Sequence, residues 1–592
     1  MPQLLWLDNR NFAVPPFCPL SFNVRYLLSP TDFVTQFPVT QETALKTRRE
    51  FLQSTLAGTA AFCFSRFPSL AASSSEAKIE ILPGETQGTI SPNIYGHFTE
   101  HLGGVIYDGI WVGPNSKVPN IDGLRRDLVE HMKKIKAPVI RYPGGCFADS
   151  YDWRDGIGPL DKRPRRTNFW AFSDQSPAKH RYEPNEFGTN EFARFCKQIG
   201  AQPYLAANVR SLPAQEFYRW VEYCNSPAGS TTLADERARA GSPEPYNVRY
   251  WGVGNESWGC GGNFTPQEYA VEFRRYTAWV PGYGKPLDFI ASGPAADDLS
   301  WTKGFFEEVL RKGKEQLNRI YGIGLHHYAW NLSRGKTNDW EKGKGDALQF
   351  DVTDWYELLR EGQRLEPMIE SHWQAMGEFD KDRHVKLVVD EWGPWYRPGS
   401  ELTPGDLLEQ TPTQRDAVFS GITLDILNRH ASQVVMGNCA QLINCLNSLY
   451  LAHQDRFVIT PVGHVFDLYS GHQGGELVRS VFSAPEVQYD RDGKPATFLG
   501  LNGSASIRGK DLLLTVVNPD TKQARETTIS LARASAASAT ARVLAASHIH
   551  ACNTFANREA VVPRSAGVTL RSGAITHIFP PASVTAMVIH LA

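Results

Sequence analysis

Cysteine is scarce in this sequence, with 9 residues among 592 and no pair spaced as C-x-x-C. Two of the nine, Cys18 and Cys63, fall in an N-terminal segment with the pattern of a leader, which leaves seven for the rest of the chain. Cysteines this few and this widely spaced predict neither a disulfide framework nor a metal site. The sequence therefore implies no metal and no cofactor.

Charge of one sign and long apolar runs are also lacking. The 61 basic and 63 acidic residues are interspersed and give a formal net charge of -2, so the sequence has no basic excess for a nucleic-acid partner. The apolar stretch nearest the N-terminus is too short to span a bilayer, and no membrane span is expected. With 42% hydrophobic residues, the chain is long enough for a large core and a second domain.

The N-terminal region differs from the rest of the chain. Residues 47–72 place two arginines, in "TRREFL", ahead of the short apolar stretch "STLAGTAAFCF" and several small residues. This order predicts a twin-arginine-like signal peptide cleaved near Ala71 or Ala72, and hence an exported protein, periplasmic or extracellular. A short buried helix is the alternative interpretation. Residues 1–46 show no clear period and are interpreted as an over-extended start or a disordered segment.

Apolar, β-branched runs alternate with amphipathic helical stretches between residues 92 and 478. The runs lie at 93–101, 138–145, 202–210, 248–257, 288–295, 322–330, 385–393 and 433–441. Parallel strands need helical crossovers, and eight such units close on themselves, so we expect an α/β fold with a (β/α)8 TIM barrel. A doubly wound open sheet is the competing architecture, but no glycine-rich phosphate loop follows the first run.

Residues 479–592 differ from the preceding region in the pattern of their apolar and turn residues. Segments such as "KDLLLTVVNP", "ETTISLA" and "ASVTAMVIHLA" are short and β-prone, with turn residues between them and almost no helical period. We predict a C-terminal antiparallel β-sandwich with a jelly-roll-like architecture. The strand-like stretch at 79–91 is expected to join this sandwich. No low-complexity linker separates the two parts, which predicts that they pack closely.

Polar side chains gather at the carboxyl ends of the predicted barrel strands, where TIM barrels carry their chemistry. The set comprises Glu100, Arg141, Asn208, Asn255, Glu256, His326, Tyr328, Asp390, Glu391 and Gln441. Two of the carboxylates, Glu256 in "GVGNESWG" and Glu391 in "VVDEWG", face each other across the predicted barrel mouth. A glycosidase needs such a pair, because one carboxyl protonates the leaving oxygen and the other acts at the anomeric carbon.

Several long motifs occur in a fixed order: "NIYGHFTEHLGG", "IRYPGGCFADSYDWRDGIGP", "FGTNEF", "GVGNESWGCGG", "VVDEWGPWY" and "TPVGHVFDLYSGH". On these motifs, the chain from about Ile79 to its C-terminus resembles the α-L-arabinofuranosidases of glycoside hydrolase family 51. The resemblance implies an exo-acting, retaining enzyme that releases terminal non-reducing arabinofuranosyl residues from oligosaccharides and polysaccharides. It also implies a homo-hexamer.

The resemblance assigns roles residue by residue. Glu256 would be the acid/base and Glu391 the nucleophile, with their carboxyl groups about 5 to 5.5 Å apart. Asn255 would hydrogen-bond the sugar 2-hydroxyl. Trp395 and Trp258 would line the leaving-group side, with a place covering the core as the alternative for each. The remaining sugar and carboxylate contacts are expected from Glu100, Arg141, His326, Tyr328 and Gln441.

Cys146 departs from the family pattern, since many members carry Asn after "PGG". The expected consequence is an altered or missing polar contact to the furanose. Cys260 is interpreted as a residue that packs its own loop. Strand alternation predicts that Asp390 and His327 point away from the site, toward the opposite faces of their strands.

Two alternatives remain open at this point. An endo-acting β-glucanase or xylanase would use the same barrel and mechanism, with an open groove in place of a pocket. A non-catalytic carbohydrate-binding protein is the alternative from another class, although both carboxylates are intact. Hydrolysis of 4-nitrophenyl α-L-arabinofuranoside discriminates among them.

Overall fold

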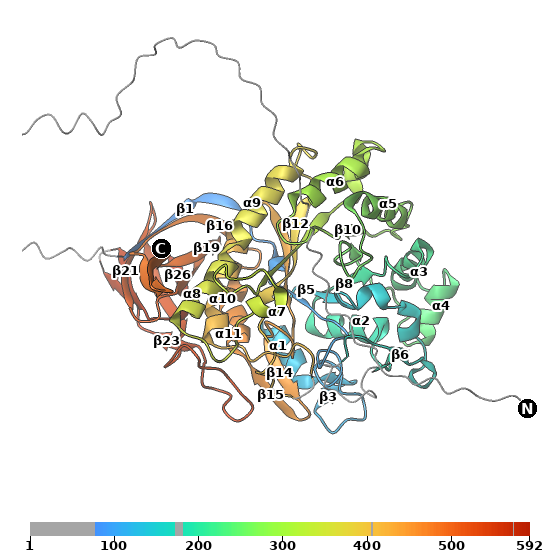
Figure 1. The fold of residues 1–592 in the computed structure, drawn as a ribbon, viewed down its shortest axis with the longest axis horizontal. Helices are drawn as coiled ribbons and strands as arrows, with labels where there is room; N and C mark the ends of the chain where they lie inside the picture. Colours follow the sequence, from blue (N-terminus) through green and yellow to red (C-terminus); the bar gives the residue numbers. More distant parts are fainter. Residues whose placement is uncertain (1–76, 172–181, 404–405, 572) are drawn as a thin grey trace, which may run out of the picture. The chain divides into compact units, whose positions relative to one another are not determined.

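The computed structural model describes residues 77–171, 182–403, 406–571 and 573–592; the predicted leader at 47–72 and the segment before it lie outside these ranges. Within the described residues, eight parallel strands form a closed barrel: β2 (Gly96–Phe98), β5 (Val139–Tyr142), β8 (Gln202–Ala207), β9 (Tyr250–Val253), β10 (Asp288–Ala291), β11 (Gly322–Ala329), β12 (Lys386–Pro394) and β13 (Val434–Ala440). Their order around the barrel is β10-β11-β12-β13-β2-β5-β8-β9; four of them, β5, β8, β10 and β12, are labelled in Figure 1. Each strand overlaps one of the predicted runs, so the predicted TIM barrel is confirmed.

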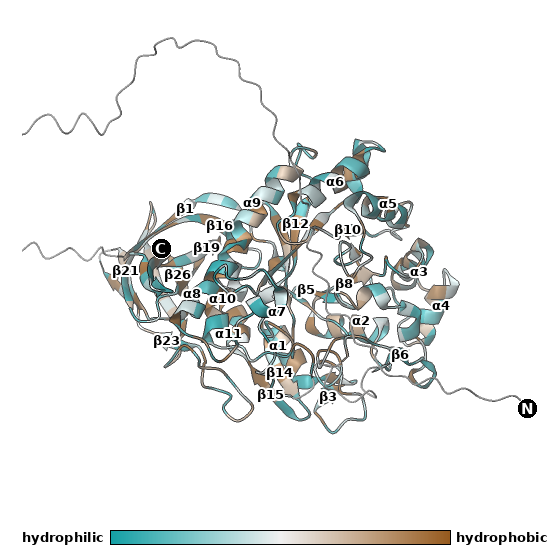
Figure 2. Cartoon of the chain, in the orientation of Figure 1, coloured by the Kyte–Doolittle hydropathy of each residue, from teal (hydrophilic) through white to brown (hydrophobic). Residues whose placement is uncertain are grey.

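Helices connect the barrel strands: α1 (Arg126–Lys134), α2 (Thr189–Ile199), α3 (Ala214–Asn225), α4 (Thr232–Arg239), α5 (Pro266–Thr277), α6 (Leu299–Leu310), α8 (Val352–Gln363), α9 (Leu365–Met376) and α10 (Gln414–Arg429). A further helix, α11 (Pro461–Tyr469), follows the last barrel strand. Figure 2 shows both hydrophilic and hydrophobic residues along helices such as α3 and α4, as expected of helices with one buried face. Among the described residues, no helix combines the length and apolar character that crossing a bilayer requires.

Helix α5 illustrates how the sequence sets a helix start. The Thr265 hydroxyl accepts a hydrogen bond from the Glu268 N–H at 3.3 Å, and the Glu268 carboxylate accepts one from the Thr265 N–H at 2.8 Å. Pro266 occupies the first helical position, where its missing N–H costs nothing. This capping box satisfies backbone donors that the helix itself cannot satisfy.

Side chains fill the barrel interior. One buried cluster takes one residue from each of six barrel strands: Val139, Tyr204, Tyr250, Ile290, Val388 and Met436. Such a plug closes the middle of the barrel. The polar residues at the carboxyl ends of the strands are then left facing the barrel mouth.

A second sheet contains ten strands within the described ranges: β1 (Ala77–Thr89), β16 (Glu476–Ser483), β19 (Asn502–Arg508), β20 (Asp511–Asn518), β21 (Arg525–Leu531), β22 (Ala536–Leu544), β23 (Arg564–Ala566), β24 (Thr569–Arg571), β25 (Ala574–Phe579) and β26 (Ser583–Leu591). Their order is β23-β22-β26-β20-β19-β16-β1-β21-β25-β24. Neighbouring strands are antiparallel except β1 and β21, which pair in parallel. The predicted antiparallel pattern therefore has one exception, at the strand that comes from the N-terminal side.

This second sheet folds over itself. Ala541 of β22 and Phe579 of β25 stand far apart in the strand order, yet both lie in one buried cluster with Ile79 and Leu514. Distant strands of one sheet can share a core only if the sheet curls so that its apolar faces meet, as in a β-sandwich.

Helix α10 joins the barrel to this sheet, and its residues are buried from Gln414 to Asn428. The carboxylate of Asp425 accepts hydrogen bonds from the hydroxyls of Ser504 and Thr515, at 2.7 Å each, and from Tyr469 at 2.9 Å. Burial raises the pKa of Asp425 to about 6, although these hydroxyl donors lower it. A buried polar network therefore fixes the sheet against the barrel.

We expect Asp425→Ala to lower the free energy of unfolding by about 2–4 kcal/mol, because buried hydroxyls lose their acceptor and a small cavity remains. Asp511→Ala is the matched control on the same sheet, since the Asp511 carboxylate pairs with His590 at the surface. The control should leave the free energy of unfolding nearly unchanged. Urea unfolding of both variants measures the difference, and equal losses would contradict the importance of the network.

Candidate active site

The turn after β9 gives Glu256 an unusual backbone geometry. Its φ is +39°, in the left-handed region that residues other than glycine rarely adopt. The Glu256 carbonyl oxygen accepts hydrogen bonds from the N–H groups of Gly259 at 2.7 Å and Gly261 at 3.2 Å, which hold this conformation. A Cβ on Gly261 would lie 1.7 Å from the Asn255 carbonyl oxygen. The glycines of "GCGG" therefore allow the tight turn that aims Glu256 at the barrel mouth.

Glu391 lies on β12 beside an irregularity. The register between β11 and β12 skips Asp390, which makes this residue a β-bulge. Both carboxylates consequently reach one guanidinium: Arg141 lies 2.7 Å from Glu391 Oε1 and 3.5 Å from Asp390 Oδ1. The prediction that Asp390 points to the opposite face of the strand is wrong, because the bulge interrupts the alternation of side chains.

Arg141, on β5, joins residues from several strands. Its Nη1 donates to Glu391 Oε1 at 2.7 Å, and its Nη2 donates to the Asn255 side-chain oxygen at 2.6 Å. Tyr328, on β11, donates its hydroxyl to the other oxygen of Glu391 at 2.7 Å. Both oxygens of Glu391 are thus held in place, and the amide of Asn255 has a fixed orientation.

His326 lies between the two glutamates. Its Nδ1 is 3.1 Å from Glu256 Oε1 and 3.5 Å from Glu391 Oε2. One carboxylate oxygen of each glutamate and a ring nitrogen of His326 all lie within 4.8 Å of one another. His327 instead hydrogen-bonds the backbone carbonyl of Glu361, on α8, at 2.8 Å, so its predicted orientation away from the site is confirmed.

The charges of neighbouring groups shift the pKa values of Glu391 and His326. Burial raises the pKa of Glu391, but the charges of His326 and Arg141 and the Tyr328 hydrogen bond outweigh it and hold this pKa below its ordinary value. Burial lowers the pKa of His326, while the carboxylates of Glu391 and Glu256 raise it above its ordinary value. Each charged partner stabilises the charged form of the other. Glu391 is therefore ionised at neutral pH.

Glu100 and Gln441 follow β2 and β13, which are neighbours in the barrel. Gln441 donates its side-chain amide to Glu100 Oε2 at 3.0 Å, and the Phe147 N–H donates to Glu100 Oε1 at 3.0 Å. Burial raises the pKa of Glu100 to about 7, against the opposing effect of these hydrogen bonds. A Cβ on Gly145 would lie 3.2 Å from an oxygen of Glu391 and 3.4 Å from one of Glu100. Because Gly145 of "PGG" has no side chain, the carboxylates of Glu391 and Glu100 can both lie close to its backbone.

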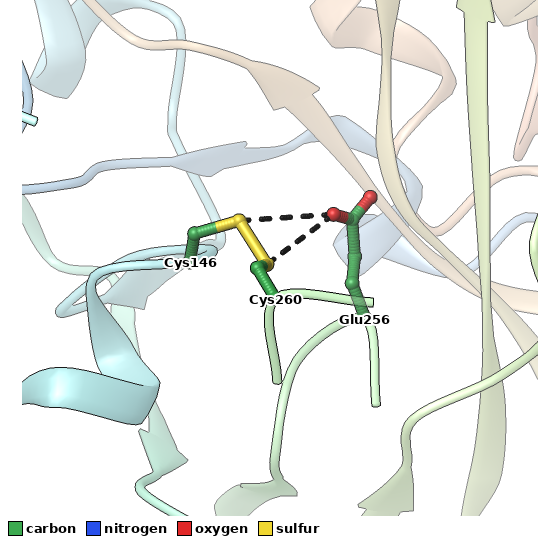
Figure 3. A group of neighbouring side chains, drawn as sticks. All are labelled: Cys146, Glu256 and Cys260. Atoms are coloured by element: carbon green, nitrogen blue, oxygen red, sulfur yellow. Dashed lines mark hydrogen bonds between the residues drawn. A yellow bond between two sulfur atoms is a disulfide. The ribbon is translucent and has the colours of Figure 1, made fainter. Parts of the chain in front are cut away.

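Cys146 and Cys260 form a disulfide, with sulfur atoms 2.08 Å apart and Cα atoms 5.6 Å apart. Glu256 Oε2 lies 3.8 Å from the Cys146 sulfur and 3.6 Å from the Cys260 sulfur, and Figure 3 shows the disulfide against this carboxylate. The prediction that the cysteines form no disulfide is wrong for this pair, as is the interpretation of Cys260 as a loop-packing residue. The loops after β5 and β9 bring together two cysteines that are 114 residues apart in the sequence.

Trp395 follows β12 and packs edge-on against Tyr328, with ring centroids 5.0 Å apart. Trp340, which begins α7 (Trp340–Gly343), lies 4.9 Å from the Trp395 ring. The ammonium of Lys344 lies 4.5 Å from the Trp340 ring centroid. The rings of Trp395 and Trp340 therefore form a row that begins at Tyr328, the residue whose hydroxyl donates to Glu391.

Sequence reasoning does not identify Asp149, which organises the backbone around Asn255. Its carboxylate accepts hydrogen bonds from the N–H groups of Val209 at 2.8 Å, Arg210 at 3.3 Å and Asn255 at 3.0 Å. Burial raises the pKa of Asp149 to about 7, and these backbone donors lower it. Because its partners are backbone amides, no residue pattern marks it; its place shortly after "PGG" is the only signal.

The predicted site residues form one connected group at the carboxyl ends of the strands: Glu100, Arg141, Cys146, Asn255, Glu256, His326, Tyr328, Glu391, Trp395 and Gln441. Among the described residues, two sets have the spacing of cation ligands: Cys146, Glu256 and Cys260, and Glu256, His326 and Glu391. A buried, ionised carboxylate facing a more exposed carboxyl group suits displacement at a sugar carbon.

The sequence matches two family models, an α-L-arabinofuranosidase 1 domain at residues 131–344 and an α-L-arabinofuranosidase C-terminal domain at residues 390–583. A Bacteroides ovatus protein named intracellular exo-α-L-arabinofuranosidase is 35% identical over 489 residues, which cover 82% of this chain and 90% of that protein. An Acetivibrio thermocellus protein named intracellular exo-α-(1→5)-L-arabinofuranosidase is 32% identical over 376 residues, which cover 60% of this chain and 68% of that protein.

The prediction of an exported protein is contradicted by these relatives, because both are named intracellular. Its basis was a pair of arginines before a short apolar stretch at residues 47–72, outside the described part of the chain. That composition is not specific to export signals, since an ordinary N-terminal segment can carry it.

Solved structures agree with the family models. The crystal structure of the GH51 arabinofuranosidase from Xanthomonas axonopodis pv. citri matches with a TM-score of 0.79 at 32% identity, covering 87% of this chain and all of that one, 100%. The arabinose complex of the Thermotoga maritima α-L-arabinofuranosidase matches with a TM-score of 0.73 at 31% identity, with coverage of 87% and 100%. The chain therefore belongs to the α-L-arabinofuranosidases of glycoside hydrolase family 51.

Proposed function

We propose that this chain acts as a retaining, exo-acting α-L-arabinofuranosidase in which Glu391 is the nucleophile and Glu256 the acid/base. The observation that carries the proposal is the carboxylate pair, with an oxygen of Glu256 within 4.8 Å of an oxygen of Glu391. Retaining glycosidases keep these groups about 5–5.5 Å apart, whereas inverting enzymes need roughly 6.5–9.5 Å to admit a water. The short spacing supports retention.

The proposed reaction is a double displacement. Glu391 attacks the anomeric carbon of a terminal arabinofuranosyl residue while Glu256 gives its proton to the glycosidic oxygen, whose bond to that carbon breaks. Glu256 then takes a proton from water, and the water oxygen displaces Glu391 from the anomeric carbon. Arabinose leaves with the free hydroxyl, and Glu256 ends the cycle protonated, as it began.

Neighbouring groups support each of these roles. Arg141 and Tyr328 orient Glu391 and keep it ionised, which a nucleophile requires. The Asn255 side-chain oxygen accepts from Arg141. Its NH2 group donates one hydrogen to Cys260 Sγ at 3.8 Å and has a second hydrogen to donate to a sugar hydroxyl, in our proposal the 2-hydroxyl. His326 hydrogen-bonds Glu256 and fixes the direction of its carboxyl group.

The remaining predicted contacts complete the proposed sugar site. Glu100 and Gln441 would bind further sugar hydroxyls, and Trp395 would line the leaving-group side. The Cys146 sulfur, bonded to Cys260, would give the sugar an apolar surface in place of a polar contact. The proposed substrates are arabinose-containing oligosaccharides and polysaccharides, as in hemicellulose degradation; the exo-α-(1→5) name of the Acetivibrio relative supports terminal α-(1→5)-linked residues among them.

Glu391→Ala should abolish turnover of every substrate, because no covalent intermediate can form. Glu256→Ala should lose least on 4-nitrophenyl α-L-arabinofuranoside, whose leaving group needs little protonation, and about 100-fold more on arabino-oligosaccharides, where general acid catalysis matters. Steady-state rates on both substrates measure these losses. Azide should yield an inverted glycosyl azide with the first variant and a retained one with the second.

Glu80→Ala serves as the matched control, since Glu80 is an exposed carboxylate on β1 of the second sheet; this variant should keep the activity of the unmodified protein. Equal losses for Glu256→Ala on activated and unactivated substrates would contradict its role as the acid. A panel of aryl glycosides separates the alternatives, because a β-glucanase or xylanase would prefer aryl glucosides or xylosides.

Glu100→Gln should change how stability depends on pH. The pKa of Glu100 is raised by burial from 4.5 to about 7, so its stabilising contribution is fully present below about pH 4.5 and is lost as the pH rises through 7. Glutamine does not titrate, so the melting temperature of the unmodified protein should fall relative to that of the variant between pH 4.5 and 8. At pH 4.5 to 5 both proteins carry a neutral group, which makes this range the internal control. Parallel melting curves across the whole range would contradict the raised pKa.

We propose a homo-hexamer, as family members commonly form, with the second sheet contributing contacts. Apolar side chains exposed on that sheet support an interface; Ile578 is 56% and Val588 45% exposed. Sedimentation equilibrium should give six chains per particle, and Ile578→Lys should shift the distribution toward smaller species. Trp279→Lys, a change at a 92% exposed residue of the barrel part, is the control. A monomer at micromolar concentration would contradict the assembly.

A further inference from the structure

We infer that the disulfide beside Glu256 conceals a metal site that appears on reduction. Once a dithiol opens the bond between Cys146 and Cys260, their sulfurs and the Glu256 carboxylate form a three-ligand site for zinc or a similar divalent cation, and the bound metal stops hydrolysis. The loss of hydrolysis rests on the proposed role of Glu256 as acid/base, whereas metal binding does not.

The chemistry balances without any other reactant. The dithiol supplies two electrons and two protons to the protein disulfide, and it becomes a cyclic disulfide itself. The protein gains two cysteine thiols. Zinc then binds both sulfurs as thiolates and Glu256 as a carboxylate, and it releases the two thiol protons and the Glu256 proton to solvent.

The ligand atoms already have nearly the spacing that zinc requires. With Zn–S bonds of about 2.3 Å and Zn–O bonds of about 2.0 Å in a tetrahedral site, a ligand oxygen and a ligand sulfur lie roughly 3.5 Å apart. Glu256 Oε2 lies 3.6 Å from the Cys260 sulfur and 3.8 Å from the Cys146 sulfur, facing both as Figure 3 shows. Only the two sulfurs have to separate, to roughly 3.8 Å, which rotation about their Cα–Cβ bonds can provide.

Arg210 holds the two cysteine loops together independently of the disulfide. Its Nη1 donates to the Cys260 carbonyl at 3.3 Å, and its Nε donates to the carbonyl of Asp149, three residues after Cys146, at 3.1 Å. The Asp149 carboxylate in turn accepts a hydrogen bond from the Asn255 N–H at 3.0 Å. The backbones of both cysteines therefore stay in place after reduction, and the thiols remain beside the carboxylate.

Exposure and charge direct a cation to the sulfur side of Glu256. The Glu256 side chain is 21% exposed, whereas that of Glu391 is 6% exposed and already paired with the cationic Arg141. Sulfur ligands favour zinc and similar metals over magnesium and calcium. A metal on Glu256 Oε2 occupies the electron pair that would hold the catalytic proton, so the acid step is lost.

A second group with cation-ligand spacing, Glu256 with His326 and Glu391, gives the rival explanation for any metal effect. That group contains no sulfur, so its affinity for metal would be the same in the oxidised and reduced proteins. Dependence on reduction therefore distinguishes the two sites.

The test compares oxidised enzyme with enzyme reduced by dithiothreitol and freed of it under nitrogen. Micromolar zinc should lower hydrolysis of an arabino-oligosaccharide, whose leaving group needs protonation, by the reduced enzyme about tenfold or more, with recovery on addition of EDTA, and leave the oxidised enzyme unchanged. Cobalt(II) reports binding without hydrolysis, through thiolate-to-cobalt charge-transfer absorption in the reduced protein.

Cys260→Ser should lose the cobalt absorption and show no reduction-dependent zinc effect relative to its own metal-free rate; Cys146→Ser is the second variant in case the first does not fold. Cys552→Ser is the matched control, because it removes a free thiol outside the site, and it should behave as the unmodified protein in both assays.

Equal inhibition of the oxidised and reduced enzymes would overturn the inference and assign the metal to the group that contains His326. Absence of cobalt absorption in the reduced protein would overturn it as well. Cobalt absorption together with undiminished hydrolysis would support the metal site, overturn the inhibition and contradict Glu256 as the acid. That last outcome separates a failure of the proposed function from a failure of the metal site.

Discussion

A buried guanidinium is the interaction on which the rest of the site depends. Arg141 is 1% exposed, and a charge buried so deeply is tolerated only when opposite charges surround it. Burial lowers the pKa of Arg141, but the carboxylates of Asp390 and Glu391 raise it above its ordinary value. Tyr204, in the barrel interior, in turn donates a hydrogen bond to Asp390 at 2.9 Å. The same contacts that neutralise the arginine set the positions of Asn255 and Glu391. A change that leaves Arg141 without its partners would therefore disturb both the barrel core and the geometry of the candidate site.

The barrel could be predicted from the sequence because each strand is a short apolar run followed by a stretch with helical period. The places of Glu256 and Glu391 at the strand ends could be predicted as well, since each follows an apolar run, whereas their catalytic roles stay predictions. The orientation of Asp390 could not, because strict alternation is an assumption about pairing. Only the register of β12 against β11 reveals the bulge that turns Asp390 toward Arg141.

Contacts between distant parts of the chain account for the other failures. A count of cysteines says nothing about which two loops meet, and the pair that bonds, Cys146 and Cys260, is separated by 114 residues. The place of Asp149 cannot be predicted for a related reason, since its hydrogen bonds go to backbone amides, which nearly every residue has. The roles proposed for Glu100 and Gln441 rest on family resemblance. A hydrogen bond between two buried side chains, as between these two, produces no periodic pattern in the sequence.

Strand β1 has a consequence for how the protein is made. Thr89, at its end, hydrogen-bonds Glu476 of β16, a residue 387 positions later in the chain, and β1 also pairs with the still later β21. At about 5–20 residues per second, the ribosome adds that length in roughly 20 to 80 s. β1 therefore emerges first and stays without its sheet partners while the whole barrel is synthesised. The barrel is an insertion within the second sheet, and this sheet can close only after the barrel strands have been synthesised.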